Sequence, residues 1–365
     1  MQMMRAAVCR AFGQPLQIED LQLTPPRAGE VRVAVAACAI CHSDIHFADG
    51  AWGGTLPAVY GHEAAGTVEE VGSGVRRVRP GDRVVISLLR SCGRCFFCER
   101  DESHLCEGEF PADREVRLHT RAGEPVEQAM HTGAFAEEVV VHESQIAVVP
   151  LSLSFEVASL LGCSVITGLG AVLDRAEVPE GSSVVVVGTG GVGLSSIQGA
   201  VLRGAGPIIA SDPSPAKRDL AGRFGATHAL DPSSGQLASA VRALTGGRGA
   251  DYVFVTVGRV DAIEEGLSYV RRGGTLVVVG MPAAGESFDV VAVDLVHDDI
   301  RILGSKMGST RLEIAVPRIV ELYESGRLKL DELITGRFRL EEINDAIAAS
   351  REGHSARNVI LLDAA

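Results

Sequence analysis

The sequence has few of the features that a nucleic-acid-binding or membrane-spanning protein needs. It contains 365 residues, with 34 Lys and Arg against 47 Asp and Glu, and its formal net charge is −13. Nucleic acid and anionic membranes both bind basic surfaces, so we expect neither as a partner. No run of apolar residues reaches the length of about 18 that a membrane helix requires. The first ten residues, MQMMRAAVCR, lack the apolar core of a signal peptide, and a cytoplasmic protein is therefore predicted.

What the chain does have is a tight row of cysteines with the spacing C-x2-C-x2-C-x7-C, formed by Cys92, Cys95, Cys98 and Cys106. Four thiolates on one short loop suit a closed tetrahedral zinc site, which binds the metal for structure because no position is left for substrate. The alternative is a set of free or disulfide-bonded cysteines. Eight cysteines without a signal peptide indicate a reducing compartment, where thiols serve as metal ligands more often than as disulfides.

The length and the pattern of strands and helices predict two domains. Residues 1 to about 150 are rich in short β-branched segments, which predict the strands Val31–Ala37, Ala64–Val71, Arg83–Leu88 and Ala136–Val141. The segment Ser154–Leu173, with small and apolar residues together, is predicted to be helical. Beyond residue 182, strands alternate with helices, as in a doubly wound parallel sheet. The predicted elements there are the strands Val184–Val187, Ile208–Ser211, Tyr252–Val257 and Thr275–Val279 and a helix over Leu194–Arg203.

The last part of the chain is predicted to be mostly helical, over Leu312–Ser325 and Glu341–Ser350. It ends in a strand, Asn358–Leu362, that we expect to rejoin the N-terminal domain.

A glycine-rich turn follows the buried strand Val184–Val187 and contains Gly188, Gly190, Gly191, Val192 and Gly193. A G-x-G-x-x-G pattern between a strand and a helix is typical of a dinucleotide site, since the helix N-terminus faces the pyrophosphate. Asp212 ends the next strand, about 20 residues on, where a carboxylate can accept hydrogen bonds from the adenosine ribose. Its charge would repel a ribose phosphate, so the pattern favours NAD over NADP. Lys217 could also reach the ribose, although a solvated surface role is equally open.

Two cysteines and a histidine can hold zinc with a fourth position open for substrate. Cys41, His62 and Cys163 have the right chemistry, but spacing alone cannot bring them together, and a lone buried cysteine is usually a small core residue.

The chain resembles the zinc-dependent medium-chain alcohol dehydrogenases from Ala6 to Leu361. The motifs that carry the resemblance are, in order along the chain, C-H-S-D-x-H, G-H-E, the cysteine row, G-C-S-x-x-T-G and G-T-G-G-V-G. It implies an α/β protein with a GroES-like, mostly β catalytic domain, residues 1–163 and 307–365. The structural zinc lobe would occupy about 90–108. A Rossmann dinucleotide-binding domain, residues 164–306, would interrupt the catalytic domain.

The resemblance also implies roles for individual residues. Cys41, His62 and Cys163 match the catalytic zinc ligands, Glu63 matches the acid beside that zinc, and Asp44 matches the carboxylate that orients the ligand histidine. The remaining matches are Ser43 and His46 in a proton relay, Thr167 and Val192 near the nicotinamide, and Arg357 at the pyrophosphate.

Two departures from the family pattern concern the cofactor and the substrate. His42 stands where the family often has an arginine that contacts the pyrophosphate, which predicts weaker cofactor retention because histidine is less reliably charged. Leu88 stands where phenylalanine is common, and Trp52, Met130 and Met281 fall near expected substrate-pocket positions. Ordinary core packing is the alternative for each of these, most of all for the methionines.

The expected function is reversible hydride transfer between an alcohol and NAD, giving an aldehyde or ketone, with one catalytic and one structural zinc per chain. A glutathione-dependent formaldehyde dehydrogenase or a polyol dehydrogenase is the alternative, and many polyol enzymes lack the complete cysteine lobe. A non-catalytic, crystallin-like protein is a remote third possibility. We expect a homodimer or homotetramer formed through the edge of the Rossmann sheet, with the strand near Thr275–Gly280 in the contact.

Overall fold

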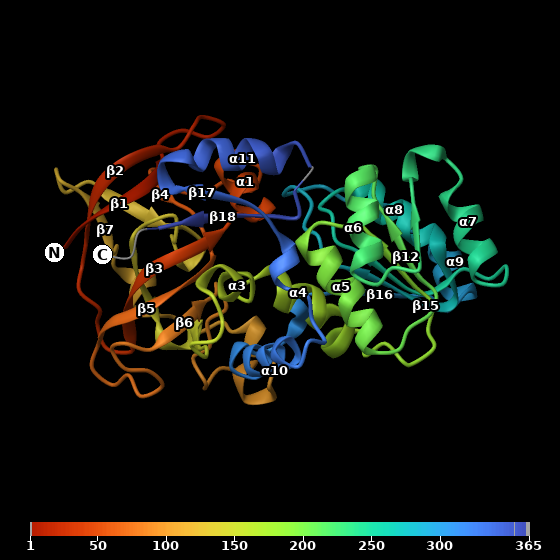
Figure 1. The fold of residues 1–365 in the computed structure, drawn as a ribbon, viewed down its shortest axis with the longest axis horizontal. Coiled ribbons are helices and arrows are strands. Elements are labelled where there is room, and N and C mark those ends of the chain that lie inside the picture. Colours follow the sequence, from red (N-terminus) through yellow and green to blue (C-terminus); the bar gives the residue numbers. More distant parts are fainter. Residues whose placement is uncertain (1, 354, 363–365) are drawn as a thin grey trace. The chain divides into compact units, whose positions relative to one another are not determined.

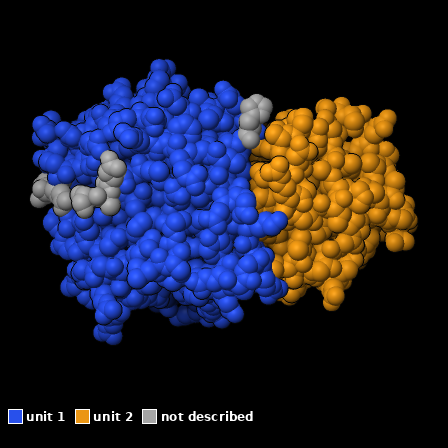
Figure 2. All heavy atoms as spheres, viewed as in Figure 1, with its two compact units in different colours: residues 1–164, 311–365 blue, residues 165–310 orange. Residues whose placement is uncertain are grey.

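The computed structural model describes residues 2–353 and 355–362, and the chain divides into two compact units (Figure 2). Unit 1 contains the residues up to Ser164 together with those from Arg311 onward, and unit 2 is Val165–Thr310.

Unit 1 is built mostly from β-strands (Figure 1). A closed barrel has the strand order β1-β2-β7-β8-β4, formed by β1 (Gln2–Cys9), β2 (Gln17–Leu23), β7 (Leu118–Thr120), β8 (Pro125–Gln128) and β4 (Ala58–Val59). A seven-stranded sheet has the order β10-β6-β5-β3-β18-β17, with β9 paired to β3. Its strands are β3 (Glu30–Ala39), β5 (Glu63–Val71), β6 (Arg83–Ile86), β9 (Glu138–His142), β10 (Ile146–Val148), β17 (Ile334–Arg339) and β18 (Arg357–Leu361).

Strand β3 lies inside the larger sheet, and apolar residues recur along it at every second position. Val31, Val33 and Val35 are buried on one face, as a half-buried strand requires. The strand pairs with β5, β9 and β18. Its antiparallel pairing with β18 confirms that the C-terminal strand returns to the first part of the chain.

Five α-helices complete unit 1: α1 (His42–Ala48), α2 (Pro111–Arg114), α3 (Phe155–Leu160), α10 (Leu312–Glu324) and α11 (Ile343–Arg351). Ser154 begins α3, because its Oγ accepts a hydrogen bond of 3.2 Å from the backbone N–H of Val157.

Unit 2 contains a six-stranded sheet in which every pairing is parallel, with the order β13-β12-β11-β14-β15-β16. The order reverses beside β11, as in a doubly wound dinucleotide-binding fold. The strands are β11 (Val184–Val187), β12 (Ile208–Ser211), β13 (His228–Leu230), β14 (Ala250–Val255), β15 (Val270–Val278) and β16 (Arg301–Gly304). The helices are α4 (Ser164–Gly170), α5 (Gly191–Leu202), α6 (Pro215–Arg223), α7 (Leu237–Leu244), α8 (Val260–Tyr269) and α9 (Ala292–His297). The predicted α/β class with a mostly β part and a doubly wound parallel sheet is confirmed.

The segment Ser154–Leu173, which is predicted to be helical, is helical except at a break of three residues that the sequence did not predict. The chain forms α3, leaves the helix at Leu161–Cys163, and resumes as α4 and a π-helical turn over Ala171–Arg175. Gly162 lies so close to the sheet that a Cβ there would stand 2.3 Å from the carbonyl oxygen of Ile86. The interruption therefore lets the backbone approach β6 and turns Cys163 inward, where it is buried.

The expected contact strand near Thr275–Gly280 is not an edge of the sheet. It lies in β15, which pairs with β14 on one side and β16 on the other. The free edge on that side is β16. Among the described residues, no helix combines the length and the apolar character of a membrane span.

Candidate metal centres and dinucleotide site

Three buried side chains from distant parts of unit 1 converge on one point. The thiols of Cys41 and Cys163 and a ring nitrogen of His62 lie within 4.8 Å of one another. His62 Nε2 is 3.2 Å from Cys163 Sγ. Cys41 precedes α1, His62 precedes β5, and Cys163 lies in the break between α3 and α4.

Asp44 fixes two of these three residues. Its Oδ2 accepts a hydrogen bond of 2.9 Å from the backbone N–H of Cys41. Its Oδ1 accepts from the backbone N–H of Gly61 at 3.0 Å and lies 2.9 Å from His62 Nδ1. Because Nδ1 is held by the carboxylate, Nε2 is left to face the two thiols.

The three side chains form a strongly interacting charge cluster. A hydrogen bond from Cys163, together with His62, lowers the pKa of Cys41 well below the usual value, whereas the pKa of Cys163 rises because of the same thiol pair and burial. Burial by itself would lower the pKa of His62, but Asp44 and Cys41 outweigh it and raise that pKa. A site that favours one thiolate before any metal arrives suits a soft divalent cation, because thiolates are the form that binds zinc.

Glu63 lies beside this cluster and is fully buried. Its Oε1 accepts hydrogen bonds from the backbone N–H and the hydroxyl of Ser164, and Arg357 Nε stands 3.7 Å away. Burial raises the pKa of Glu63 to about 7. Its Oε2 has no hydrogen-bond partner among the described residues, and a buried acceptor without a partner is costly. Three metal-type donors with an unpaired carboxylate oxygen next to them fit a bound cation. The contact between Ser164 and Glu63 was not predicted. Ser164 directly follows Cys163, but nothing in the sequence indicates that it would donate hydrogen bonds to Glu63.

Arg357 is nearly fully buried, and the pair that it forms with Glu63 is internal to unit 1. The sequence predicted it at a cofactor pyrophosphate, and that role stays a prediction.

The remaining predicted residues of this region lie on or just after α1. His42 is the first, exposed residue of the helix, Ser43 follows it, and His46 lies in the last turn. The ring of His46 lies 5.1 Å from that of Trp52, and Phe47 meets Trp52 edge-on at 5.0 Å. Trp52 therefore packs directly against the predicted relay histidine.

The second cluster is the cysteine row, which we call the four-cysteine lobe (residues 90–108). The Sγ atoms of Cys92, Cys95, Cys98 and Cys106 lie within 4.8 Å of one another, and none of them forms a disulfide. Cys106 Sγ accepts hydrogen bonds of 3.3 Å from the backbone N–H groups of Cys92 and Gly108. Backbone hydrogen bonds from Cys98 and Glu107 lower the pKa of Cys95 to about 6. Four converging thiols with N–H donors aimed at sulfur fit a closed zinc site.

In unit 2 the glycine turn joins β11 to α5. Gly188 has φ +86°, which favours glycine, and Gly190 precedes the helix. A Cβ on Gly193 would stand 1.9 Å from the carbonyl oxygen of Gly188, so only glycine permits the close turn. Around Gly190 nothing lies within 4 Å of where a Cβ would be. The turn thus leaves open space at its second glycine, where a pyrophosphate would approach.

Asp212 follows β12 and is buried against that turn. Its carboxylate accepts 2.9 Å hydrogen bonds from the backbone N–H groups of Thr189 and Ser214. The backbone oxygen of Lys217 lies 3.4 Å from the hydroxyl of Thr189. Thr167 is buried in α4, and its hydroxyl lies 3.6 Å from Met307 Sδ. Val192, in the first turn of α5, is partly buried.

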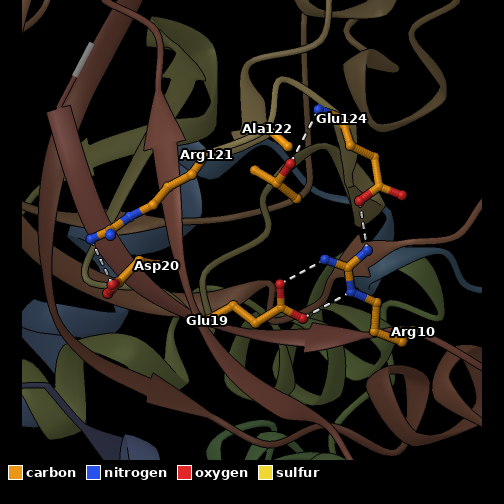
Figure 3. A pocket seen from close by; sticks show the side chains of 7 residues that line it. Arg10, Glu19, Asp20, Arg121, Ala122 and Glu124 are labelled. Atoms are coloured by element: carbon orange, nitrogen blue, oxygen red, sulfur yellow. Dashed lines mark hydrogen bonds and ion pairs between the residues drawn. The ribbon is translucent and has the colours of Figure 1, made fainter.

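The predicted pocket residues have unequal exposure. Leu88, Met130 and Trp52 are partly buried, whereas Met281 is 62% exposed in the chain. One hollow of about 490 Å³ lies elsewhere, on the barrel of unit 1 (Figure 3). Both arginines that line it are paired, Arg10 with Glu19 and Glu124, and Arg121 with Asp20. A hollow lined by satisfied ion pairs lacks the apolar walls typical of a small-molecule site.

The fold and the two cysteine-based clusters together define a zinc-binding dehydrogenase. Two family models match the chain: the alcohol dehydrogenase GroES-like domain over residues 27–151 and the zinc-binding dehydrogenase over residues 191–323. The chain belongs to the zinc-dependent medium-chain alcohol dehydrogenases and is an oxidoreductase of that family.

Three proteins that are similar to this chain are named for different activities. The NDMA-dependent alcohol dehydrogenase of Amycolatopsis methanolica is 37% identical, with 98% of each chain covered. A Schizosaccharomyces pombe protein named "Probable S-(hydroxymethyl)glutathione dehydrogenase 1" is 38% identical over 98% of this chain and 96% of its own. The crystal structure of benzyl alcohol dehydrogenase from Acinetobacter calcoaceticus superposes with a TM-score of 0.93 at 28% identity, covering 99% of this chain and 100% of that chain. The relatives therefore agree on the alcohol dehydrogenase family and differ in named substrate.

Proposed function

We propose that this zinc-dependent alcohol dehydrogenase transfers hydride reversibly between a primary or secondary alcohol and NAD, giving an aldehyde or ketone. The proposal is supported above all by the approach of Cys41, His62 and Cys163 to within 4.8 Å of one another. Beside them, Glu63 Oε2 has no hydrogen-bond partner in the described part of the chain. Three protein donors are the number that leaves a metal position open to substrate.

When bound by these three residues, zinc supplies a Lewis acid that polarises the oxygen of an alcohol or a carbonyl. Asp44 keeps His62 in the tautomer that presents Nε2 to the site. Ser43 would accept the proton of the alcohol as it donates its own hydroxyl proton to a ribose hydroxyl of the cofactor. That hydroxyl would in turn donate its proton to His46, which would release one to solvent. Glu63 would stand beside the ligands as the acid that the family resemblance places next to the metal.

The cofactor contacts are also proposals. The turn Gly188–Gly193 would hold the pyrophosphate at the N-terminus of α5. Asp212 would accept hydrogen bonds from the adenosine ribose, with Lys217 beside it, and its negative charge favours NAD over NADP. Thr167 and Val192 would flank the nicotinamide, and His42 and Arg357 would meet the pyrophosphate. Trp52, Leu88, Met130 and Met281 would line the substrate pocket.

The four-cysteine lobe would bind a second zinc that supports the fold. The eight cysteines form no disulfide, which favours a reducing, cytoplasmic location.

A homo-oligomer through the edge strand β16 is proposed as well. Helix α9, which precedes β16 in the chain, exposes Val293 at 69% and Val296 at 80%, and Val291, directly before the helix, is 61% exposed. Exposed apolar side chains can mark an interface when they form one patch. The molar mass in solution, compared with that of a Val293→Glu variant, tests this proposal.

The glutathione-dependent reaction is a second candidate, because one relative is named as a probable S-(hydroxymethyl)glutathione dehydrogenase. A polyol reaction is less favoured, since the lobe is complete. The test is NADH formation by the zinc-loaded protein with primary, secondary, benzylic and polyol alcohols, and with formaldehyde in the presence and absence of glutathione. NDMA is added as an acceptor in a parallel series. His62→Ala should abolish turnover and remove one zinc per chain, while the exposed His228→Ala should change neither. Full turnover in His62→Ala with unchanged zinc would refute the ligand assignment.

A further inference from the structure

Unit 1 contains a turn whose backbone conformation is unfavourable for its residues. Met130 has φ 51° and ψ 28°, His131 has φ 58°, and Gly133 has φ 63°. Only the last is a glycine, so two residues with a Cβ occupy the left-handed region in succession. Such a conformation persists only where surrounding contacts impose it.

Two amide side chains, the buried Gln145 and the partly buried Gln128, hold the backbone of this turn. Gln145 Nε2 donates hydrogen bonds to the carbonyl oxygens of His131 at 3.0 Å and Ser87 at 3.1 Å. Gln128 Nε2 donates to the carbonyl oxygen of Thr132 at 2.7 Å. These contacts fix the position of the turn, but none of them reaches the His131 side chain.

Arg90 supplies that contact. Its guanidinium donates to Asp113 Oδ1 at 2.6 Å and to His131 Nε2 at 3.3 Å, and it stacks 4.4 Å above the centroid of the Phe110 ring. Since a guanidinium only donates, Nε2 of His131 accepts, and the ring proton lies on Nδ1, which stands 3.7 Å from Asp113. The Arg90 side chain is only 13% exposed. Burial alone would raise the pKa of Asp113, but the hydrogen bonds from Arg90 and from the Phe110 N–H lower it, as expected for a tightly held pair.

Arg90 is also the first residue of the four-cysteine lobe. Ser91, the next residue, donates its backbone N–H to Ser144 Oγ at 2.9 Å, and Cys92 follows. The first zinc-type ligand of the lobe is therefore two residues from the group that holds His131.

On its other side the turn leads to the candidate catalytic cluster. Ala134 N–H donates to the carbonyl oxygen of Gly61 at 2.9 Å, and Phe135 N–H donates to that of Tyr60 at 2.8 Å. His62 is the next residue after Gly61. A continuous set of contacts within unit 1 thus runs from the lobe through Arg90 and the turn to the residues before His62.

We propose that Arg90 is a positioning residue that couples the four-cysteine lobe to the turn Met130–Gly133, and through Met130 to substrate binding. The assignment of Met130 to the substrate rests on the proposed function; the coupling between lobe and turn does not. If the lobe loses its metal, the backbone that carries Arg90 is no longer held in position. The Arg90 side chain then no longer holds the turn in its unfavourable conformation. By linkage, any change in the turn must also alter how tightly the lobe holds its metal.

The experiment compares Arg90→Gln, His131→Gln and a control, Arg100→Gln. Arg100 lies on the lobe as well, but it stacks on Phe96 at 3.7 Å and is exposed. We expect Arg90→Gln and His131→Gln each to raise the KM for alcohol about fivefold, with kcat within about twofold of the parent, the lower range of a coupling energy. Arg100→Gln should leave KM unchanged.

The second readout is zinc release to a chromogenic chelator, measured in a His62→Ala background so that only lobe zinc is followed. Both variants should release it about fivefold faster than the parent. His131→Gln is decisive, because its side chain is 51% exposed, outside the lobe and compatible with folding. Parental zinc release and parental KM in His131→Gln would overturn the proposal, as would a lower melting temperature with both readouts unchanged. If the parent protein has no dehydrogenase activity, the proposed function fails, and zinc release alone decides the coupling.

Discussion

The carboxylate of Asp44 lies 2.9 Å from Nδ1 of His62 and also accepts a hydrogen bond from the backbone N–H of Cys41. Two carboxylate oxygens accept three N–H donors, which come from Cys41, Gly61 and His62. The orientation of two predicted ligands therefore depends on one charged side chain.

Replacing Asp44 with Asn should weaken zinc binding at this site. The amide group of Asn must face at least one of the three donors, so one hydrogen bond becomes a repulsion. We expect a roughly 10- to 100-fold lower zinc affinity, the usual effect of losing such a partner. A chelator competition titration measures it. Asp49→Asn, at the other end of α1 and paired with Arg351 on the surface, is the control. Unchanged affinity in Asp44→Asn would show that the carboxylate does not support the metal.

Gly190→Ala should separate cofactor binding from stability. Gly190 has φ −71°, and its Cβ would meet no atom within 4 Å, so the fold should tolerate alanine. The methyl group would, however, occupy the space where a pyrophosphate approaches the turn. We expect an unchanged melting temperature and about tenfold weaker NADH binding by fluorescence titration. Gly193→Ala should instead destabilise the protein. Parental NADH affinity in Gly190→Ala would remove the pyrophosphate from this turn.

His142 should make stability depend on pH. Burial lowers its pKa, and its Nδ1 accepts a hydrogen bond of 3.2 Å from the Ser144 N–H, which requires the neutral ring. The unfolded chain binds the proton more readily than the folded one. This contribution to stability is therefore present above the usual pKa of 6.5 and is lost as pH falls below it. His142→Gln should flatten the unfolding free energy between about pH 5 and 7, where histidine titrates. Exposed His228→Gln should leave the slope as it is; a parental slope in both variants would count against the assignment.

Cys106→Ser should disrupt the four-cysteine lobe. The Cys106 thiol accepts two backbone N–H groups, and the lobe would keep three ligands without it. We expect one zinc per chain instead of two and a loss of unfolding free energy on the order of 4 kcal/mol, as when a structural metal is lost. Denaturant unfolding with metal analysis measures both. Phe96→Ala, an exposed change on the same lobe, should retain the zinc. Two zincs in Cys106→Ser with unchanged stability would show that Cys106 is not needed to hold the metal.

The parallel sheet was predictable because its strands are buried on both faces. Val184–Val187 and Ile208–Ser211 are strands with the predicted bounds. The barrel strands β1, β2, β7 and β8 were not predicted. Three or four residues, as in β7 and β8, carry too little periodicity to be recognised. The break near Gly162 depends on a tertiary contact with Ile86, which an apolar sequence does not reveal.

For the candidate site, residue chemistry identified the four-cysteine lobe and the glycine turn, because both are local in sequence. The grouping of Cys41, His62 and Cys163 came only from the family resemblance, since the chain between them has no periodicity that joins them. Ser164 and Arg90 were not predicted, because their importance comes from what they contact.

The protein contains one tryptophan, and its ring packs against His46 and Phe47. Selective excitation of indole emission therefore reports on this corner of unit 1 alone, without any attached dye. Titrations of metal, nucleotide or alcohol can be followed optically in the unmodified chain.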